Sequence, residues 1–249
     1  MSKIGFIGGS GLDDLNILER SSTVSIQTPY GDTSSTIKKG EISGQKVAIL
    51  ARHGVHHSIS PSNINYRSNI WALKEVGCSH ILATTAVGSL REKIKPGDIV
   101  FPDQFIDHTK KRLSTFFDGN EIIHTPMDEP FSSELIRLLE STASELEIRH
   151  HSRKTVITIE GPRVSSKSES HMFRSWGADV VNMSSCPEVI LAKELNIEYA
   201  TLAMATDYDC WKENEEPVTW DMVQKTMKNN ADNVISILIN AVSKIKTFN

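Results

Sequence analysis

Glu198-Tyr-Ala-Thr-Leu-Ala-Met-Ala-Thr-Asp-Tyr-Asp-Cys-Trp211 is the stretch that decides the fold. Its first part, residues 198–205, is a short apolar run, which predicts a buried strand. The strand ends abruptly in the polar segment 206–209. Ligands of open α/β sheets bind where the strands end, so we expect the polar segment to lie near a binding site.

Asp207 and Asp209 form a pair of carboxylates that project to the same side if the chain stays extended. Placed close together, each carboxylate raises the pKa of the other, so that one of them can hold a proton at neutral pH. Such a pair suits a base edge, because it accepts from an amino group and donates to a ring nitrogen. A solvated acidic loop or a helix start is the simpler interpretation of these residues taken alone.

The composition is that of an ordinary soluble protein. The 249 residues suffice for one large α/β domain, and 39% are hydrophobic and 23% charged. The formal net charge is −4 and the Lys and Arg residues are scattered, so the sequence does not indicate a basic surface for nucleic acid or an anionic membrane. No apolar run could span a bilayer, and the N-terminus does not resemble a signal peptide. We therefore expect a cytoplasmic protein with neither a nucleic-acid nor a membrane partner.

The cysteines and histidines argue against a metal site. Cys78, Cys186 and Cys210 are widely spaced and form no Cys-x-x-Cys pair, which disfavours a disulfide framework and structural zinc. Adjacent His56 and His57 have no carboxylate or cysteine at a spacing usual for a shared metal. We expect no metal.

Short apolar runs alternate with helical patterns along the chain, which predicts an α/β layered fold. No repeat or linker divides the chain, so we expect a single domain, 1–249, around a central mixed sheet. The predicted strands are 4–7, 36–39, 46–51, 80–85, 98–106, 155–159, 179–183 and 198–205. The predicted helices are 63–76, capped by Ser62, then 133–146, two opened by capping boxes at Ser166 and Ser185, and 220–244.

Gly8-Gly-Ser-Gly11 follows the first strand, and its backbone N–H groups and the Ser10 hydroxyl can hold a phosphate. A dinucleotide site would need a third glycine where Asp14 stands, and no Gly-Lys-Ser/Thr triplet marks a Walker A loop. A tight turn without a ligand is equally consistent with this stretch.

Two further strand ends carry groups that suit an oxyanion. Arg52 offers a planar pair of donors to phosphate, and His53 can donate or accept a proton. Thr85 either binds an anion or satisfies backbone groups at the end of its strand. No carboxylate cluster for magnesium lies among these donors, which favours inorganic phosphate as a reactant.

Two other strand ends supply surface for the rest of a substrate. Gly161-Pro162 enforces a turn, Arg163 can fix that turn, and Ser165 points toward the sheet edge. Met183 offers a soft apolar face for a sugar, and Ser184 adds a hydroxyl. We expect these strand ends to converge on one pocket.

Taken in order, these segments resemble the purine nucleoside phosphorylase superfamily over essentially the whole chain. The resembling segments are 7–14, 51–54, 69–75, 84–91, 96–98, 104–107, 159–163, 176–179, 182–183, 187–188 and 205–212. The resemblance implies a single α/β domain with a central mixed, partly barrel-like β-sheet flanked by helices. It also implies a pentosyltransferase that uses inorganic phosphate as co-substrate and needs no cofactor. The resembling branch cleaves 5′-methylthioadenosine in purine and methionine salvage.

The resemblance also implies roles for single residues. Asp207 would hydrogen-bond purine N7 as the general acid or its assistant, Asp209 would accept from the 6-amino group, and Ser165 would support the base. The implied catalytic residues are Asp207, Ser165 and His53. The implied phosphate ligands are the strand-end residues Ser10, Arg52, His53, Thr85, Ala86 and Ser184.

The remaining implied contacts are to the base, the ribose and its 5′-substituent: Met183, Val164, Trp220, Val223 and Gln224, together with His124. His124 matches a family segment that reaches into the site of a neighbouring subunit, which implies a homotrimer.

Three departures from the family pattern leave the substrate open. Val164 stands where the family usually places a Phe on the base, Gln224 replaces an apolar residue, and Trp220 replaces a smaller one. The alternatives are a broader adenosine or 6-aminopurine nucleoside phosphorylase and a methylthioinosine phosphorylase. An aspartate facing a 6-oxo group disfavours the latter. A nucleoside-binding module without catalysis, or a hydrolase that uses water, is a further alternative.

Overall fold

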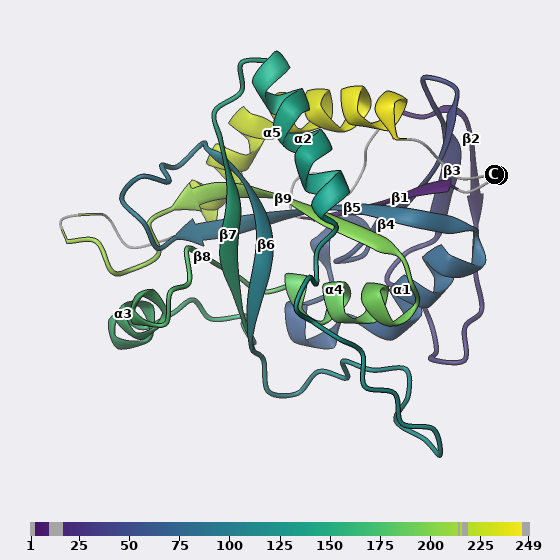
Figure 1. The fold of residues 1–249 in the computed structure, drawn as a ribbon, viewed down its shortest axis with the longest axis horizontal. Coiled ribbons are helices and arrows are strands. Elements are labelled where there is room, and N and C mark those ends of the chain that lie inside the picture. The colour runs from purple at the N-terminus through teal and green to yellow at the C-terminus, as the bar shows by residue number, and fades with distance from the viewer. Residues whose placement is uncertain (1–2, 10–16, 214, 216–218, 246–249) are drawn as a thin grey trace.

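One mixed sheet runs through the part of the chain that the computed structural model describes, residues 3–9, 17–213, 215 and 219–245 (Figure 1). Its nine described strands are β1 Lys3–Gly8, β2 Glu19–Val24, β3 Ile37–Ile42, β4 Gln45–Ala51, β5 Cys78–Ser89, β6 Ile99–His108, β7 His150–Ile159, β8 Val180–Asn182 and β9 Glu198–Asp207. They are ordered β2-β3-β4-β1-β5-β8-β7-β6-β9, and β9 also pairs with β5. The last five strands therefore close on themselves, which confirms the predicted single α/β domain with a partly barrel-like sheet.

Four neighbouring strands of this sheet run parallel: β4, β1, β5 and β9. Their carboxyl ends lie at one edge, where Gly8 pairs with Ala51 and, further along, Gly88 pairs with Asp207. All of β1 beyond Lys3 and all of β9 beyond Glu198 are buried, as expected for parallel strands covered on both faces. The strand ends that the sequence singles out thus meet at a common edge.

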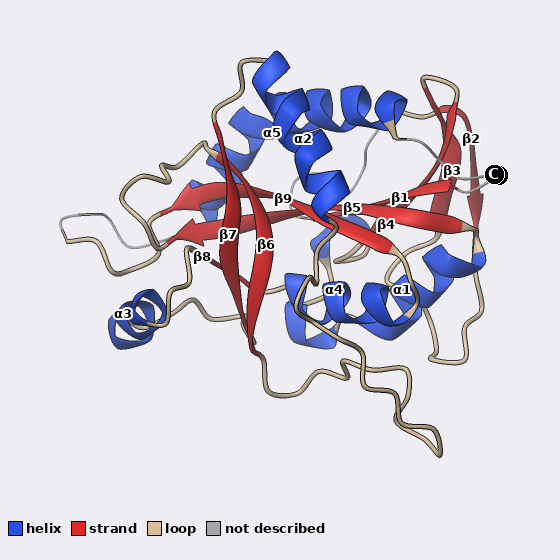
Figure 2. Ribbon diagram, viewed as in Figure 1, coloured by secondary structure: helices blue, strands red, loops and turns tan. Residues whose placement is uncertain are grey.

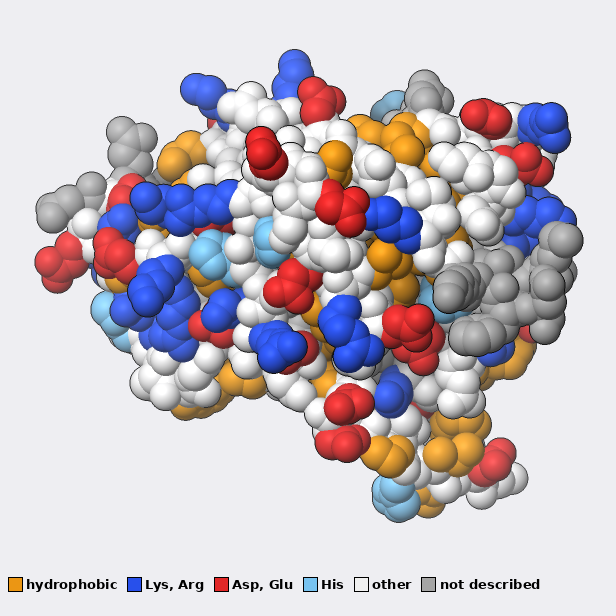
Figure 3. Space-filling view, turned by 45° about the horizontal axis from the view of Figure 1, so that its top comes forward, with side chains coloured by type: hydrophobic (Ala, Val, Ile, Leu, Met, Phe, Trp, Pro, Cys, Tyr) orange, Lys and Arg blue, Asp and Glu red, His pale blue; other side chains and the backbone are white. Residues whose placement is uncertain are grey.

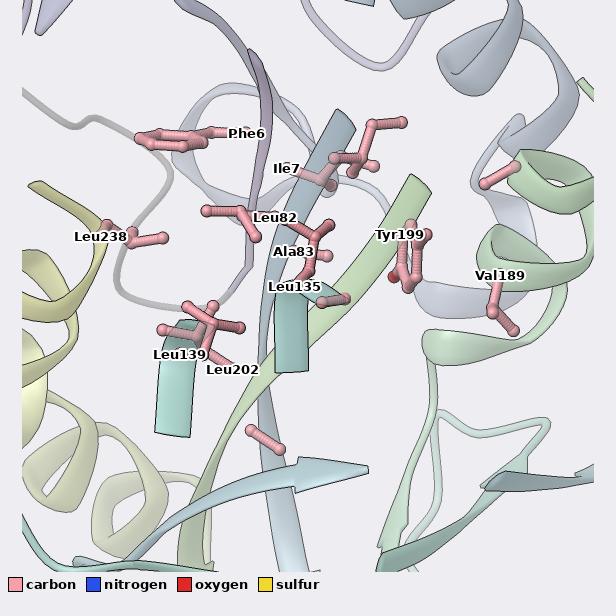
Figure 4. Close-up of a cluster of buried hydrophobic side chains, with 14 of the residues drawn as sticks. Phe6, Ile7, Leu82, Ala83, Leu135, Leu139, Val189, Tyr199, Leu202 and Leu238 are labelled. Carbon is pink, nitrogen blue, oxygen red and sulfur yellow. The ribbon is translucent and has the colours of Figure 1, made fainter. Parts of the chain in front are cut away.

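Helices cover both faces of the parallel part (Figure 2). One face carries α1 Tyr66–Glu75 and α4 Ser185–Glu194, and the other carries α2 Ser133–Glu145 and α5 Trp220–Lys244. Figure 4 shows the core between them, with Tyr199 beside Val189 of α4, and Leu202 beside Leu139 of α2. The shorter α3, Lys167–Ser175, lies to the side, near β8.

Most predicted elements are confirmed, but one helix start and one capping box are wrong. Helix α1 begins only at Tyr66 because Asn65 is its cap, while Ser62 belongs to a separate short 3-10 turn, Pro61–Asn63. Helix α4 has no side-chain cap, so the predicted capping box at Ser185 does not form. The capping box of α3 is present.

A long connection, residues 109–132, projects from the body between β6 and α2 (Figures 1 and 3). It exposes large apolar side chains: Leu113 is 58% and Ile122 is 76% exposed. The segment is anchored at its base by Arg112, which is described below. Among the described helices, none combines the length and hydropathy needed to cross a bilayer.

Candidate functional site

A cavity of about 480 Å³ opens where the predicted strand ends meet. Among the predicted phosphate ligands, it is lined by His53, Thr85, Ala86 and Ser184. Among the predicted base and sugar contacts, it is lined by Met183, Val164, Ser165, Asp207, Asp209 and Val223. The structure therefore brings together residues that are more than 150 positions apart in the sequence.

Three other predicted residues do not line the cavity in the described structure. Arg52 is buried behind the wall, and the side chains of His124 and Gln224 are exposed. Ser10 and the side chain of Trp220 lie outside the described residues.

Arg52 is held by a buried carboxylate that the sequence analysis did not single out. Its Nε donates to Glu188 Oε1 at 2.5 Å and its Nη2 donates to Glu188 Oε2 at 2.9 Å. The hydroxyl of Tyr199 donates to the same Oε2 at 2.8 Å. Burial opposes the charge of Arg52, but the attraction and hydrogen bonds of Glu188 outweigh burial and raise the pKa of the guanidinium. Arg52 therefore keeps its charge, and the two-point contact with Glu188 fixes the orientation of its guanidinium.

The remaining donors of Arg52 point toward the turn after β1. Nη1 donates to the carbonyl of Thr84 at 2.7 Å, which leaves one N–H on each terminal nitrogen without a partner among the described residues. Gly9 packs directly above, since a Cβ there would lie 2.6 Å from Nη1 and 2.5 Å from the Thr84 carbonyl. This glycine is required by close approach of backbone and guanidinium, whatever the ligand.

A chain of hydroxyl and amide groups connects Thr85, which lies inside β5 because that strand runs on to Ser89, with the ends of β7 and β8. The hydroxyls of Thr85 and Ser184 lie 3.1 Å apart, and Asn182 donates to Thr85 Oγ1 at 3.4 Å. Asn182 also donates to Ser185 Oγ at 2.7 Å and accepts from Thr158 at 2.8 Å. Thr85 Oγ1 also donates to the carbonyl of Ala86 at 3.1 Å. The two cavity hydroxyls are thus held in place as neutral groups that can turn a proton toward an anion.

His53 is a neutral imidazole in this site. Its Nδ1 lies 2.9 Å from the carbonyl of Ile59, which can only accept, so Nδ1 carries the proton. Burial and the adjacent Arg52 charge lower the pKa of His53 to about 3. The ring of His57 stacks on it with centroids 4.1 Å apart. The neutral ring presents Nε2 as an acceptor rather than as a second cation.

The carboxylates of Asp207 and Asp209 lie together at the other end of the cavity. The chain does not stay extended, because Asp209 has a positive φ of 50° and its own N–H donates to Asp207 Oδ1 at 2.7 Å. The hydroxyl of Thr206 donates to Asp207 Oδ2 at 2.7 Å. The pKa values of both carboxyls are raised, and burial is the largest cause for each. Mutual repulsion, the expected cause, contributes least for Asp207.

Gly88 of β5 makes room for this acidic pair. A Cβ at Gly88 would lie 3.0 Å from Asp207 Oδ1, 3.2 Å from Asp209 Cβ and 3.1 Å from Val181. A side chain at this position would push against the carboxylate that faces the cavity.

Three buried polar residues around the site are not among the predicted site residues: Glu188, Tyr199 and Asn182. Glu188 is the last residue of the pattern Ser185-x-x-Glu188, so the sequence predicts that it caps a helix. Its position after Cys186-Pro187, inside an apolar run, is the sequence feature that indicates a buried carboxylate.

The buried pair leads to a stability prediction. We expect Glu188→Gln to lower the free energy of unfolding by about 3–5 kcal/mol, because the Arg52 charge is left buried without its counter-ion. The control is Glu145→Gln, which breaks the exposed ion pair with Lys244 and should cost at most about 1 kcal/mol. Urea unfolding measures both changes, and equal small losses would contradict the role given to Glu188.

Comparison with known proteins agrees with this geometry. Residues 3–243 match the model of the phosphorylase superfamily. The S-methyl-5′-thioadenosine phosphorylase of Danio rerio is 56% identical over 248 residues, which cover 98% of this chain and 89% of that protein. The enzyme of the same name from Drosophila melanogaster is 53% identical, with 98% of this chain and 86% of that protein covered.

Solved structures show the same fold. Methylthioadenosine phosphorylase from Schistosoma mansoni in complex with adenine superposes with a TM-score of 0.94 at 39% identity, covering 98% of this chain and 92% of that one. A mutant adenosine/methylthioadenosine phosphorylase from the same species, in complex with methylthioadenosine, gives 0.93 at 38% identity, covering 98% and 91%. The chain therefore belongs to the phosphorylase superfamily and, within it, to the family of S-methyl-5′-thioadenosine phosphorylases.

Proposed function

We propose that the chain catalyses phosphate-dependent cleavage of the glycosidic bond of 5′-methylthioadenosine, giving adenine and 5-methylthioribose 1-phosphate. The observation that carries the proposal is one cavity with two chemically different ends. Neutral hydroxyl donors, Thr85 and Ser184, lie at one end, and the buried acids Asp207 and Asp209 lie at the other. A nucleoside between them would meet phosphate at its sugar and acids at its base.

At the base end, the raised pKa of Asp207 favours a protonated carboxyl that can donate to purine N7. A departing base that carries a proton or hydrogen bond leaves more easily than a bare anion. Asp209 would accept from the 6-amino group, and Ser165 would support the base. These roles favour a 6-aminopurine over a 6-oxopurine.

At the sugar end, the C1′–N9 bond breaks as an oxygen of phosphate forms a bond to C1′. The transition state resembles an oxocarbenium ion, and the phosphate dianion stabilises its positive charge. Thr85, Ala86 and Ser184 would bind this phosphate, and Ser10 and the two remaining N–H groups of Arg52 would add donors. His53 Nε2 would accept from the remaining hydroxyl of the phosphate dianion. Met183 would pack on the ribose. No metal or organic cofactor takes part in this scheme.

We infer a homotrimer, in which segment 109–132 of one protomer carries His124 to the neighbour's cavity. The exposed apolar side chains Leu113 and Ile122 support burial of this segment in an assembly. The free thiols of Cys78, Cys186 and Cys210 agree with a reducing cytoplasm. Adenine would return to purine salvage, and the sugar phosphate would enter methionine salvage.

A broader adenosine phosphorylase is the second candidate. Gln224 is a polar residue predicted near the 5′-substituent, and its side chain is exposed. Val164 lines the cavity but is 47% exposed, so it covers less of a base than a phenyl ring would. A relative from Schistosoma mansoni is named for both adenosine and methylthioadenosine, which supports this second candidate.

Free base release from 5′-methylthioadenosine, adenosine and inosine, each with and without phosphate, tests the proposal. We expect phosphate-dependent adenine release that is fastest from methylthioadenosine, because an apolar methylthio group suits Val223 better than a hydroxyl does. Equal use of adenosine would favour the second candidate. Release without phosphate would indicate a hydrolase, and binding without release would indicate a nucleoside-binding module.

Asp207→Asn tests the acid. We expect kcat to fall by about 10²- to 10⁴-fold, since an amide cannot deliver a proton to N7. The control is Asp232→Asn, which changes an exposed aspartate of α5 and should leave kcat unchanged. Near-normal turnover by Asp207→Asn would refute the assigned role.

The same variant has a signature in the pH dependence of stability. Because burial raises the folded-state pKa of Asp207, the unfolded chain releases this proton first as pH rises. The contribution of Asp207 is therefore intact below its unfolded pKa and is lost as pH rises through the raised folded pKa. We expect the free energy of unfolding of Asp207→Asn, relative to the wild type, to increase across that window in urea titrations at several pH values.

Gly88→Ala tests the position of the acidic pair. The added methyl group would press on the Asp207 carboxylate, so we expect kcat/KM to fall about tenfold or more. Gly119→Ala is the matched control, because a Cβ at Gly119 meets nothing within 4 Å. Equal kinetics of the two variants would show that this contact does not set the carboxylate position.

A further inference from the structure

Arg112 is a buried cation at the base of the projecting segment 109–132, and it faces the cavity wall from behind. Its side chain is only 1% exposed. Nη1 donates to the carbonyl of Met183 at 2.6 Å and to the carbonyl of Cys186 at 2.7 Å. Nη2 donates to the carbonyl of Glu160 at 2.9 Å. One guanidinium thus holds backbone from two separate segments.

Both segments form walls of the cavity. Met183 and Ser184 line it on the side that follows β8. Ile159 and Pro162 line it on the side that follows β7, and they flank the carbonyl of Glu160. These two walls are neighbours, since β7 pairs with β8 and a Cβ at Gly161 would lie 2.5 Å from Met183 Sδ. Arg112 therefore fixes the position of the proposed ribose wall relative to the wall beside it.

Glu160, which follows β7, also binds the start of the projecting segment through its side chain. Its carboxylate accepts from the backbone N–H of Lys110 at 2.7 Å and of Lys111 at 3.1 Å. Its Oε1 lies 3.6 Å from Arg112 Nε, a long ion pair that partly balances the buried charge. The start of the projecting segment and the end of β7 thus hold each other.

The chemistry of these contacts requires arginine. The partners are backbone carbonyls, which only accept, and they lie on different sides of one planar group. The guanidinium offers donors in a fixed fork, whereas a lysine ammonium is a compact point charge on a flexible stem. Tyr66 adds to the fit, because its hydroxyl lies 3.0 Å from Nη1 and shares one of its two N–H groups, and its ring centroid lies 5.1 Å from the guanidinium carbon.

We propose that Arg112 is a positioning residue for the proposed phosphorolysis, and that its guanidinium sets how the two neighbouring cavity walls lie against each other. It acts through Met183 and the Glu160 carbonyl and does not touch the reacting atoms. The expected effect on KM rests on the proposed function. The contacts of Arg112 with the cavity walls do not depend on that function.

Arg112→Lys and Arg112→Ala test the proposal. We expect the KM for 5′-methylthioadenosine to rise about tenfold or more in Arg112→Ala, with a smaller rise in Arg112→Lys and less change in kcat. The reason is that a displaced Met183 weakens binding of substrate and transition state alike. Guanidinium chloride at tens of millimolar should lower the raised KM of Arg112→Ala by filling the space left by the side chain, and leave the wild type unchanged.

Arg67→Ala is the matched control. Arg67 of α1 holds the same projecting segment, through Asp118 at 2.6 Å and the carbonyl of Thr115 at 3.5 Å, and its guanidinium lies over the ring of Tyr30. Among the described residues, none of these partners lines the cavity. We expect Arg67→Ala to raise KM less than Arg112→Lys does. If it raises KM as much as Arg112→Lys does, the effect belongs to the segment in general and the proposal is wrong. If KM stays normal in both Arg112→Ala and Arg112→Lys, the proposal is also wrong.

Calorimetric binding of 5′-methylthioadenosine without phosphate separates this inference from the proposed function. If the wild type binds the nucleoside but releases no adenine with phosphate, the proposed function fails. The positioning role then still predicts about tenfold weaker binding by Arg112→Ala than by Arg67→Ala. Should Arg112→Ala not fold, Arg112→Lys carries the same comparison.

Discussion

The buried ion pair between Arg52 and Glu188 is the constraint on which the rest of the site depends. It joins the end of β4 to α4, and the Tyr199 hydroxyl adds β9 to the same carboxylate. An unpaired charge at this depth is strongly unfavourable, so these elements cannot shift separately. The loop that carries Met183 and Ser184 immediately precedes α4 and inherits its position from this pair.

The cavity combines two kinds of preorganisation around this frame. At one end, neutral groups are fixed by hydrogen bonds to each other, so an anion would meet oriented dipoles without a large cost of reorganisation. At the other end, burial rather than charge repulsion sets the proton affinity of Asp207 and Asp209. The two ends are therefore tuned by different physical effects, and a substitution at one end need not disturb the other.

The sequence predicts the strands and the polar residues at their ends well, because a buried run followed by polar residues has few alternatives. The prediction from the sequence is wrong where one pattern is compatible with two structures. Ser185-x-x-Glu188 has the spacing of a capping box, but the Glu188 side chain is buried and pairs with Arg52. The prediction also misses β2, whose residues 19–23 are exposed and carry no apolar alternation. Arg112 escapes detection because its loop has no periodicity and its partners are backbone carbonyls, which no side-chain pattern reveals.

Closure of the sheet by the β5–β9 pairing has a consequence for behaviour in concentrated solution. Within the described part of the chain it leaves β2 as the free edge of the sheet, where backbone groups are open to another strand. The register of β2 against β3 is broken between Glu19 and Ser22, and the charged Glu19 and Arg20 stand on this edge. Irregular register and charge both hinder strand addition. We therefore expect self-association to proceed through the projecting segment, as a closed assembly, rather than as an open fibre of paired edges.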